Sequence, residues 1–278
     1  MKRLWKFLSH RLLGMISMLA FVISAFALII WLTPRWGVLS LGEGLVPIAP
    51  LTAGVFLLLS GSMLTYCIIK SHKYATTGLA GVALLTTLVC LGVLVQRIFP
   101  AITILENLLV GESATLGGIP LGRMSPATAS LLGIFCMGLL LRFSALKKHF
   151  WSRQLSAVLN IISLLASFTI IVSYITGMPL LYGYFTIPVS LITSILLFLI
   201  NIAFMGYSTQ DVWPAAVFAS PEGLKHDSAR HFRIGVMTAF IFFTLTVGTT
   251  TVLYLRAETQ SYKQSIQEQL ESIAELKA

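Results

Sequence analysis

Histidines and cysteines are the residues of this chain most able to do chemistry, and their spacing disfavours a reactive or metal-binding site. The five histidines fall in segments that we expect to lie between apolar spans, which disfavours a haem held between helices. Two of them share a loop with Asp227, where basic neighbours disfavour a metal. The three cysteines lie far apart within apolar segments, so we expect small packing residues rather than a disulfide or a zinc site. These residues are His10, His72, His149, His226, His231, Cys67, Cys90 and Cys136.

Polar residues inside the apolar segments are the next candidates. Asn160 and Asn201 would lie on two neighbouring spans. Their ordinary role is an interhelical hydrogen bond worth about 1 kcal/mol, and contact with a small ligand is the alternative. Tyr174, Tyr182 and Tyr184 fall at the loop between these spans, where they either line a pocket or belong to an interfacial aromatic belt.

Motifs of known catalytic machinery are missing from the sequence. It has no phospho-accepting histidine motif, no glycine-rich nucleotide site and no acidic metal-binding loop. We therefore expect no enzymatic activity and no cofactor or metal.

The composition predicts an integral membrane protein. Of the 278 residues, 56% are hydrophobic and 10% are charged, against about 25% charged in soluble domains. From Gln154 to Gln210 there is no Asp, Glu, Lys or Arg, and this run is broken at Gly177-Met178-Pro179. Such a run predicts two spans and a short loop. The net charge is +9, but the basic residues cluster between spans, so we expect the lipid bilayer as a partner and no nucleic acid.

We predict an all-α integral membrane protein with seven transmembrane helices, arranged as three helical hairpins plus a seventh span that continues into an amphipathic helix. Residues 1–255 would form the membrane domain, and 256–278 an extracytoplasmic stalk helix with an apolar stripe. The stalk ends in mid-helix, which predicts the start of a truncated sensing domain, and with span seven it predicts a homodimer contact. The predicted spans are residues 12–32, 47–69, 74–96, 125–141, 155–175, 188–207 and 234–255.

The basic residues predict the orientation of the chain in the membrane. Thirteen lie in the N-terminal segment and in the connections on its side, whereas Arg35, Arg97 and Arg123 lie on the other side. Because cytoplasmic segments carry the excess of Lys and Arg, we expect a multi-pass protein of the inner (cytoplasmic) membrane with its N-terminus in the cytoplasm and its C-terminus outside. The thirteen are Lys2, Arg3, Lys6, Arg11, Lys70, Lys73, Arg142, Lys147, Lys148, Arg153, Lys225, Arg230 and Arg233.

Three of the predicted spans begin alike, which indicates an internal repeat. A threonine followed by a small residue recurs at intervals of 76 and 65 residues, with a proline two or five residues before it. Proline suits the first helical turn, and a small residue one turn later lets a neighbouring helix approach closely. The alternative is three independent, well-formed helix starts. The repeat residues are Pro47, Pro50, Thr52, Pro126, Thr128, Pro188 and Thr193.

These motifs resemble a family of bacterial signalling modules. The repeated proline–threonine starts, the segment Gly122-Arg123-Met124-Ser125-Pro126 and the Tyr-x-x-Gly-x-Pro-Leu-Leu-Tyr-Gly pattern at 174–183 resemble multi-span, membrane-associated sensor (MASE-like) regions. Such regions stand at the N-terminus of sensor histidine kinases and diguanylate cyclases. The resemblance covers about residues 40–278 and implies a downstream signalling domain or partner kinase, although this chain lacks the family's output domain.

We therefore expect a non-catalytic sensory or input module of a bacterial signal-transduction protein, which passes a signal by helix repacking. Two alternatives are a small-molecule transporter or channel built from the three hairpins, and an inactive truncated remnant of a sensor histidine kinase. The predicted spans contain no ionisable group in their interiors, which disfavours ion-coupled transport.

Overall fold

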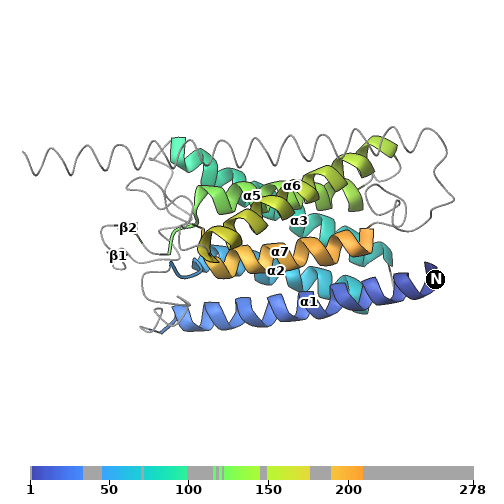
Figure 1. The fold of residues 1–278 in the computed structure, drawn as a ribbon, viewed down its shortest axis with the longest axis horizontal. Helices are drawn as coiled ribbons and strands as arrows, with labels where there is room; N and C mark the ends of the chain where they lie inside the picture. The colour runs from blue at the N-terminus through green and yellow to red at the C-terminus, as the bar shows by residue number, and fades with distance from the viewer. Residues whose placement is uncertain are drawn as a thin grey trace, which may run out of the picture.

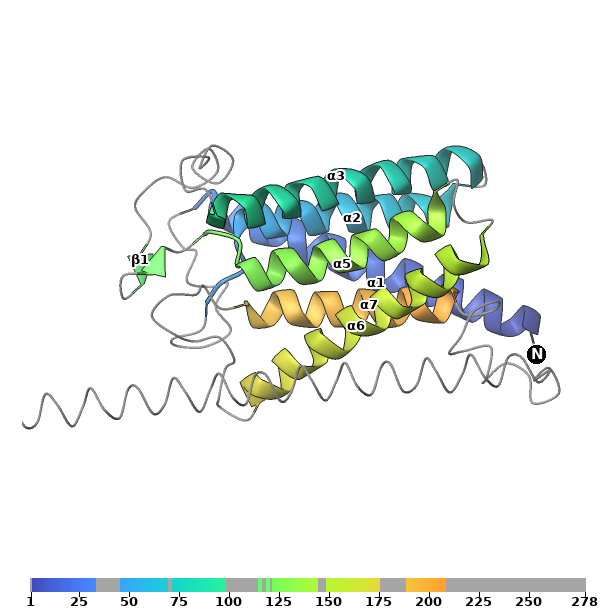
Figure 2. The ribbon, with the colours of Figure 1, turned by 90° about the horizontal axis from the view of Figure 1, so that it is seen from above.

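In the part of the chain that the structure describes, six helices run antiparallel in one bundle (Figure 1, Figure 2). The computed structural model describes residues 2–33, 46–69, 72–98, 115–116, 119–120, 122–144, 149–175 and 189–208. The helices are α1 Lys2–Trp31, α2 Pro50–Ile68, α3 His72–Ile98, α5 Pro126–Phe143, α6 Phe150–Ile175 and α7 Leu191–Ser208. In the described ranges the one strand pairing is antiparallel and joins β1 Thr115–Leu116 to β2 Ile119–Pro120. The sequence did not predict this pairing.

Five of the helices are long and apolar enough to cross a membrane, by length and composition. The apolar segment of α7, Leu191–Tyr207, is shorter than these five. The all-helical architecture is thus confirmed, and the five helices indicate a membrane protein. Residues 209–278 lie outside the described ranges, so the seventh span, the stalk and the division at residue 255 stay predictions. The five segments are Leu8–Trp31, Pro50–Ile68, Lys73–Gln96, Pro126–Phe143 and Trp151–Ile175.

Several helices begin at other residues than the predicted spans. Helix α1 begins at Lys2 instead of near Leu12, and α6 begins at Phe150 instead of near Leu155. Basic and aromatic residues can remain in a helix while their side chains reach the membrane interface, so a helix can extend beyond its apolar segment. As a result His10 lies within α1 and within its apolar segment, and the expectation that every histidine lies outside the spans is wrong for His10.

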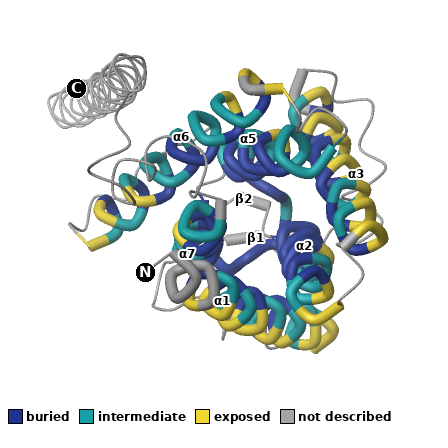
Figure 3. Tube along the Cα trace, turned by 90° about the vertical axis from the view of Figure 1, so that its right-hand side faces the viewer, coloured by how far each residue is buried: buried dark blue, intermediate teal, exposed yellow. Residues whose placement is uncertain are grey.

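The helices form a closed ring of three hairpins, α1–α2, α3–α5 and α6–α7, in which each helix packs against the next and α7 packs against α1. Viewed along the bundle, α2, α5 and α7 lie nearer the middle, and α1, α3 and α6 lie between them on the outside (Figure 3). We call these two sets the inner and the outer helices. Half of the α2 segment is buried, a larger share than in any of the other four membrane-length helices.

The inner helices begin at equivalent residues. Thr52, Thr128 and Thr193 are each the third residue of their helix and are each buried. In all three helices the first turn is closed by a backbone hydrogen bond from the residue after the threonine to the residue before the helix, at 2.9, 2.9 and 3.1 Å. Pro50 and Pro126 are the first residues of α2 and α5, where the missing N–H has no helical partner to lose. Pro47 is buried just before α2, and Pro188 lies outside the described residues.

The outer helices carry a buried stripe that is also in register. In each of them six buried positions are spaced by four, four, three, four and three residues, and these stripes are 66 and 77 residues apart. Small and hydroxylated residues dominate, which lets helices approach closely inside a membrane. The large apolar side chains of the outer helices, such as Met15, Leu84 and Leu155, are exposed instead. The stripes are Ser9, Leu13, Ser17, Ala20, Ser24 and Ala27; Ala75, Leu79, Ala83, Thr86, Cys90 and Val93; and Ser152, Ser156, Asn160, Ser163, Ser167 and Ile170.

Apolar side chains of the inner helices form a continuous core, with equivalent positions of the three helices at each level. Nine of these side chains are at most 1% exposed and belong to one hydrophobic cluster. The rings of Phe135 and Phe204, from α5 and α7, meet edge to face with centroids 6.0 Å apart. Among the described residues, the space between the inner helices therefore contains packed apolar side chains. The three levels are Phe56, Leu132 and Leu197; Leu59, Phe135 and Ile200; and Met63, Leu139 and Phe204.

Candidate functional site

The stripe of α6 is the most polar of the three and contains the first predicted site residue. Five of its six members carry a hydroxyl or an amide, and Asn160 at its centre is 3% exposed. We call Ser152, Ser156, Asn160, Ser163 and Ser167 the polar strip. The equivalents of Asn160 in α1 and α3 are Ser17 and Ala83, so the amide is particular to the third hairpin.

Near the start of α6, the first two residues of the polar strip donate hydrogen bonds to the backbone of α5. The Ser156 hydroxyl donates to the Gly138 carbonyl at 2.6 Å, and the Ser152 hydroxyl donates to the Leu141 carbonyl at 2.9 Å. Gly138 is required by this approach, because a Cβ there would lie 2.8 Å from Asn160 Nδ2 and 3.3 Å from the Ser156 carbonyl oxygen. The Asn160 amide itself donates to Ser156 O at 2.7 Å, within its own helix. Asn160 therefore faces α5.

The second predicted asparagine joins α7 to the same strip. Asn201 is fully buried, and its Nδ2 donates to Ser163 Oγ at 3.1 Å and to Leu197 O at 2.8 Å. The Ser163 hydroxyl in turn donates to Leu131 O of α5 at 3.4 Å. The polar strip thus connects α5, α6 and α7, and no hydrogen bond joins Asn160 to Asn201.

The positions of Asn201 and Ser163 have equivalents in both of the other hairpins, and one of those pairs is also in contact. In the second hairpin Cys136 and Thr86 occupy these positions, and their side chains are hydrogen-bonded. In the first hairpin the positions hold Ser60 and Ala20, and Ser60 Oγ donates to the Phe56 carbonyl of its own helix at 2.5 Å. Only the third hairpin places an amide here, so its helices are joined by the most polar contact of the three.

Buried polar atoms without a hydrogen-bond partner are concentrated in the third hairpin, which contributes four of the six found in the described residues. In the described part of the chain there are six, and each belongs to α1, to α6 or to segment 189–208. Asn160 and Asn201 are among them, because each Nδ2 is engaged and each Oδ1 accepts no bond. A buried group left in this state costs about 1–3 kcal/mol, and a bilayer offers no water to replace the bond. The atoms are Ser17 Oγ, Ser24 Oγ, Arg153 Nε, Asn160 Oδ1, Ser190 Oγ and Asn201 Oδ1.

The predicted tyrosine site is only partly described. The Tyr174 hydroxyl, at the end of α6, donates to the Val189 carbonyl just before α7. Trp31 occupies the equivalent position of α1, and its Nε1 donates to Ile48 O just before α2 at 2.8 Å. Both aromatic residues therefore tie the end of an outer helix to the start of its inner helix. Tyr182 and Tyr184 lie outside the described residues.

An aromatic cluster at the opposite end of the inner helices was not predicted. The hydroxyls of Tyr66 and Tyr207 are hydrogen-bonded to each other, and the two rings meet edge to face. The ring of Phe143 packs against Tyr66 at 5.2 Å, and the ring of His10 lies 6.0 Å from Tyr207. The cluster thus joins α1, α2, α5 and α7. Aligning the three inner helices on their threonines would have found it, since Tyr66 and Tyr207 are equivalent positions.

All the charged side chains of the described region are basic. The described ranges contain no Asp or Glu, and no Lys, Arg or His is among their buried residues. They also hold no group of three side chains suited to a metal ion. What the site offers a ligand is therefore uncharged hydrogen-bonding groups inside an apolar bundle.

Comparison with family models, with curated proteins and with solved structures finds no match. The resemblance to membrane-associated sensor regions therefore stays a prediction.

Proposed function

We propose that this chain is a membrane-embedded, non-catalytic input module of a signal-transduction protein, in which α7 shifts between two packing arrangements. The supporting observation is that four of the six partnerless polar atoms in the described residues belong to the third hairpin, on α6, on α7 or at Ser190 just before α7, and none to the described side chains of α2, α3 or α5. An arrangement with several unpaired buried groups is poorly stabilised at those contacts. A modest stimulus then suffices to favour another arrangement.

The position of α7 in the chain makes it suited to pass on such a shift. It precedes residues 209–278, for which the sequence predicts the seventh span and the stalk helix. In this proposal the shift of α7 reaches a homodimer formed through those segments, and a downstream signalling domain or partner kinase. The N-terminus faces the cytoplasm of a bacterial inner membrane and the C-terminus faces outside. A cytoplasmic reporter fused at Ala278 that is active would contradict this orientation.

The described core favours an input module over the transporter alternative. Transport through the middle of the ring requires a path, and the three apolar levels between the inner helices are packed and at most 1% exposed. Ion-coupled carriers also use Asp, Glu, Lys, Arg or His side chains within the membrane, and none of these is among the buried residues of the described chain, where His10 is only half-buried. Substrate-dependent flux through proteoliposomes containing the full chain would support the transporter instead.

The test measures two distances by pulsed electron paramagnetic resonance in lipid nanodiscs. One spin-label pair joins α5 to α7 at Met137 and Ile202, and a control pair joins α2 to α3 at Leu58 and Leu91, all partly exposed positions. The native cysteines are replaced first. We expect two populations for the α5–α7 pair, with a ratio that changes in Asn201→Leu, and one population for the control pair. A single, unchanged α5–α7 distance in both backgrounds would show that α7 does not shift.

A further inference from the structure

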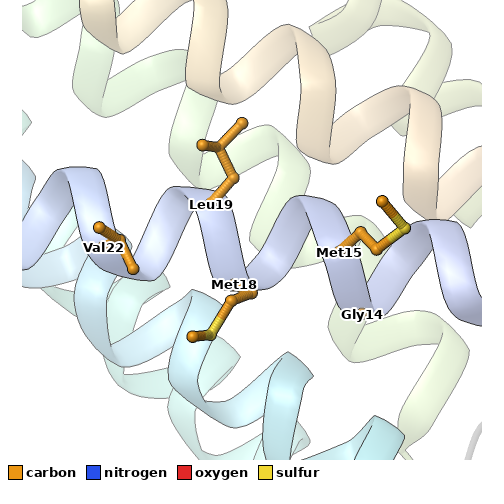
Figure 4. Close-up of a pocket in the computed structure, with 5 residues that line it drawn as sticks. All are labelled: Gly14, Met15, Met18, Leu19 and Val22. Carbon is orange, nitrogen blue, oxygen red and sulfur yellow. The ribbon is translucent and has the colours of Figure 1, made fainter.

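The outer face of α1 carries a shallow, open apolar groove that no other helix of the described residues fills. The groove has a volume of about 500 Å³ and is lined by Gly14, Met15, Met18, Leu19 and Val22 (Figure 4). Its side chains are largely exposed, with Met15 at 71%. The lining spans nine residues of helix, which corresponds to about 12 Å along the axis. Its shape and chemistry therefore suit a hydrocarbon chain lying along α1.

A basic residue stands at one end of this groove. Arg11 is exposed and lies three and four residues before Gly14 and Met15, on the same face of α1. A guanidinium at that position can pair with phosphate oxygens through two parallel hydrogen bonds. The first turns of α1 add Lys2, Arg3 and Lys6 in sequence. An apolar groove with a cation at one end matches a lipid with a negatively charged headgroup.

The three-fold arrangement shows that this combination is particular to α1. The residues equivalent to Arg11 are Thr77 in α3 and Gln154 in α6, and neither carries a charge. The residue equivalent to Met18 in α3 is Leu84, and both are 50% exposed. Helix α3 therefore has a similar apolar face without the cation, and it provides matched controls.

We propose that the groove of α1 binds one acyl chain of an anionic phospholipid, with Arg11 holding its phosphate. The bound lipid belongs to the leaflet at the N-terminal end of α1, which the sequence predicts to be cytoplasmic. A second copy of this chain and a free fatty acid are the competing occupants.

The test is native mass spectrometry of the detergent-purified full chain titrated with phosphatidylglycerol, phosphatidylcholine or palmitate. We expect phosphatidylglycerol to be retained most tightly. Arg11→Gln weakens its binding about fivefold, the amount typical of one cation near a lipid surface, and leaves phosphatidylcholine unaffected. Met18→Trp fills the groove and weakens both phospholipids. The controls Lys73→Gln and Leu84→Trp, at exposed positions of α3, change neither.

Each competing occupant predicts a different result. Equal losses in Arg11→Gln and Lys73→Gln, or in Met18→Trp and Leu84→Trp, would overturn the site on α1. Palmitate that binds as tightly as phosphatidylglycerol would assign the groove to a single-chain acid. A change of oligomeric mass in Met18→Trp but not in Leu84→Trp would assign it to a second copy. Matching thermal melts of all four variants show that they are folded.

Discussion

Gly138→Ala tests whether the polar strip of α6 depends on a close approach to α5. A methyl group at this position would lie 2.8 Å from Asn160 Nδ2, 3.5 Å from Asn160 Cγ and 3.3 Å from the Ser156 carbonyl oxygen. The asparagine cannot move without losing its bond to Ser156 O, and the helices cannot separate without stretching the 2.6 Å bond from Ser156 Oγ to Gly138 O. Overpacking of this kind lowers the free energy of unfolding by about 1–3 kcal/mol.

Gly54→Ala is the matched control for this change. A Cβ at Gly54 meets nothing within 4 Å, so the substitution only improves helix propensity, by up to about 1 kcal/mol. We expect Gly138→Ala to be less stable than Gly54→Ala by about 1–3 kcal/mol. The assay is equilibrium unfolding in mixed detergent micelles, followed by circular dichroism and tryptophan fluorescence.

A double-mutant cycle identifies the atom responsible. Asn160→Ala removes the nearest obstacle, so the double variant Gly138→Ala/Asn160→Ala should recover at least 0.5 kcal/mol relative to the sum of the single changes, within the range known for contacting residues. Equal stability of Gly138→Ala and Gly54→Ala, or additive single changes, would refute the close contact of α5 and α6 at this point.

Three further predictions use the same unfolding assay. Ser125→Ala should lower the free energy of unfolding by about 0.5–2 kcal/mol, because Ser125 Oγ accepts a hydrogen bond from Thr128 N at the start of α5. Ser190→Ala should lower it by less, since Ser190 Oγ is buried without a partner. Equal losses in the two variants would contradict this prediction. Asn201→Leu should leave the free energy of unfolding unchanged or raise it by about 1 kcal/mol, because removal of the partnerless Oδ1 offsets the lost hydrogen bond to Ser163. A decrease of more than about 1 kcal/mol would show that Oδ1 has a partner. Tyr66→Phe and Tyr207→Phe should each cost about 0.5–1.5 kcal/mol and should not add in the double variant, since each removes the same hydroxyl pair.

The sequence predicted the inner helices better than the outer ones. Alignment on Thr52, Thr128 and Thr193 uses local signals, since proline and a small residue in the first turn favour one helix position. The structure places the three threonines at that same position. The ends of α1 and α6 were misplaced because hydropathy marks the apolar segment of a helix and not the helix.

The stripes of the outer helices were present in the sequence but were missed. Their periods are 66 and 77 residues, whereas the inner helices repeat at 76 and 65, because the connection within the second hairpin, which contains β1 and β2, is about ten residues longer. No single period aligns both sets. In a bilayer the large apolar residues also face outward and small polar ones face inward, so hydrophobicity does not mark the buried side. In the aromatic cluster, the alignment of the inner helices relates Tyr66 to Tyr207, but it does not indicate the contacts with Phe143 and His10, which depend on how four helices pack.

Comparison of the three hairpins shows where this bundle departs from its own repeat. At the inner position the residue becomes larger along the chain, from Ser60 to Cys136 to the amide of Asn201, and the facing outer position changes from Ala20 to Thr86 and Ser163. Ser60 and Cys136 are satisfied within a helix or by one short contact, whereas the amide oxygens of Asn160 and Asn201 in the third hairpin stay unpaired, as do the hydroxyls of Ser17 and Ser24 in the first hairpin. Packing alone does not require these amides, because the same position works with a serine or a cysteine in the other hairpins. Four of the six partnerless atoms belong to the third hairpin, so in the proposed function this hairpin is where a changed packing has most to gain, with Asn201 Oδ1 on α7 itself and Asn160 Oδ1 on the side of α6 that faces α5.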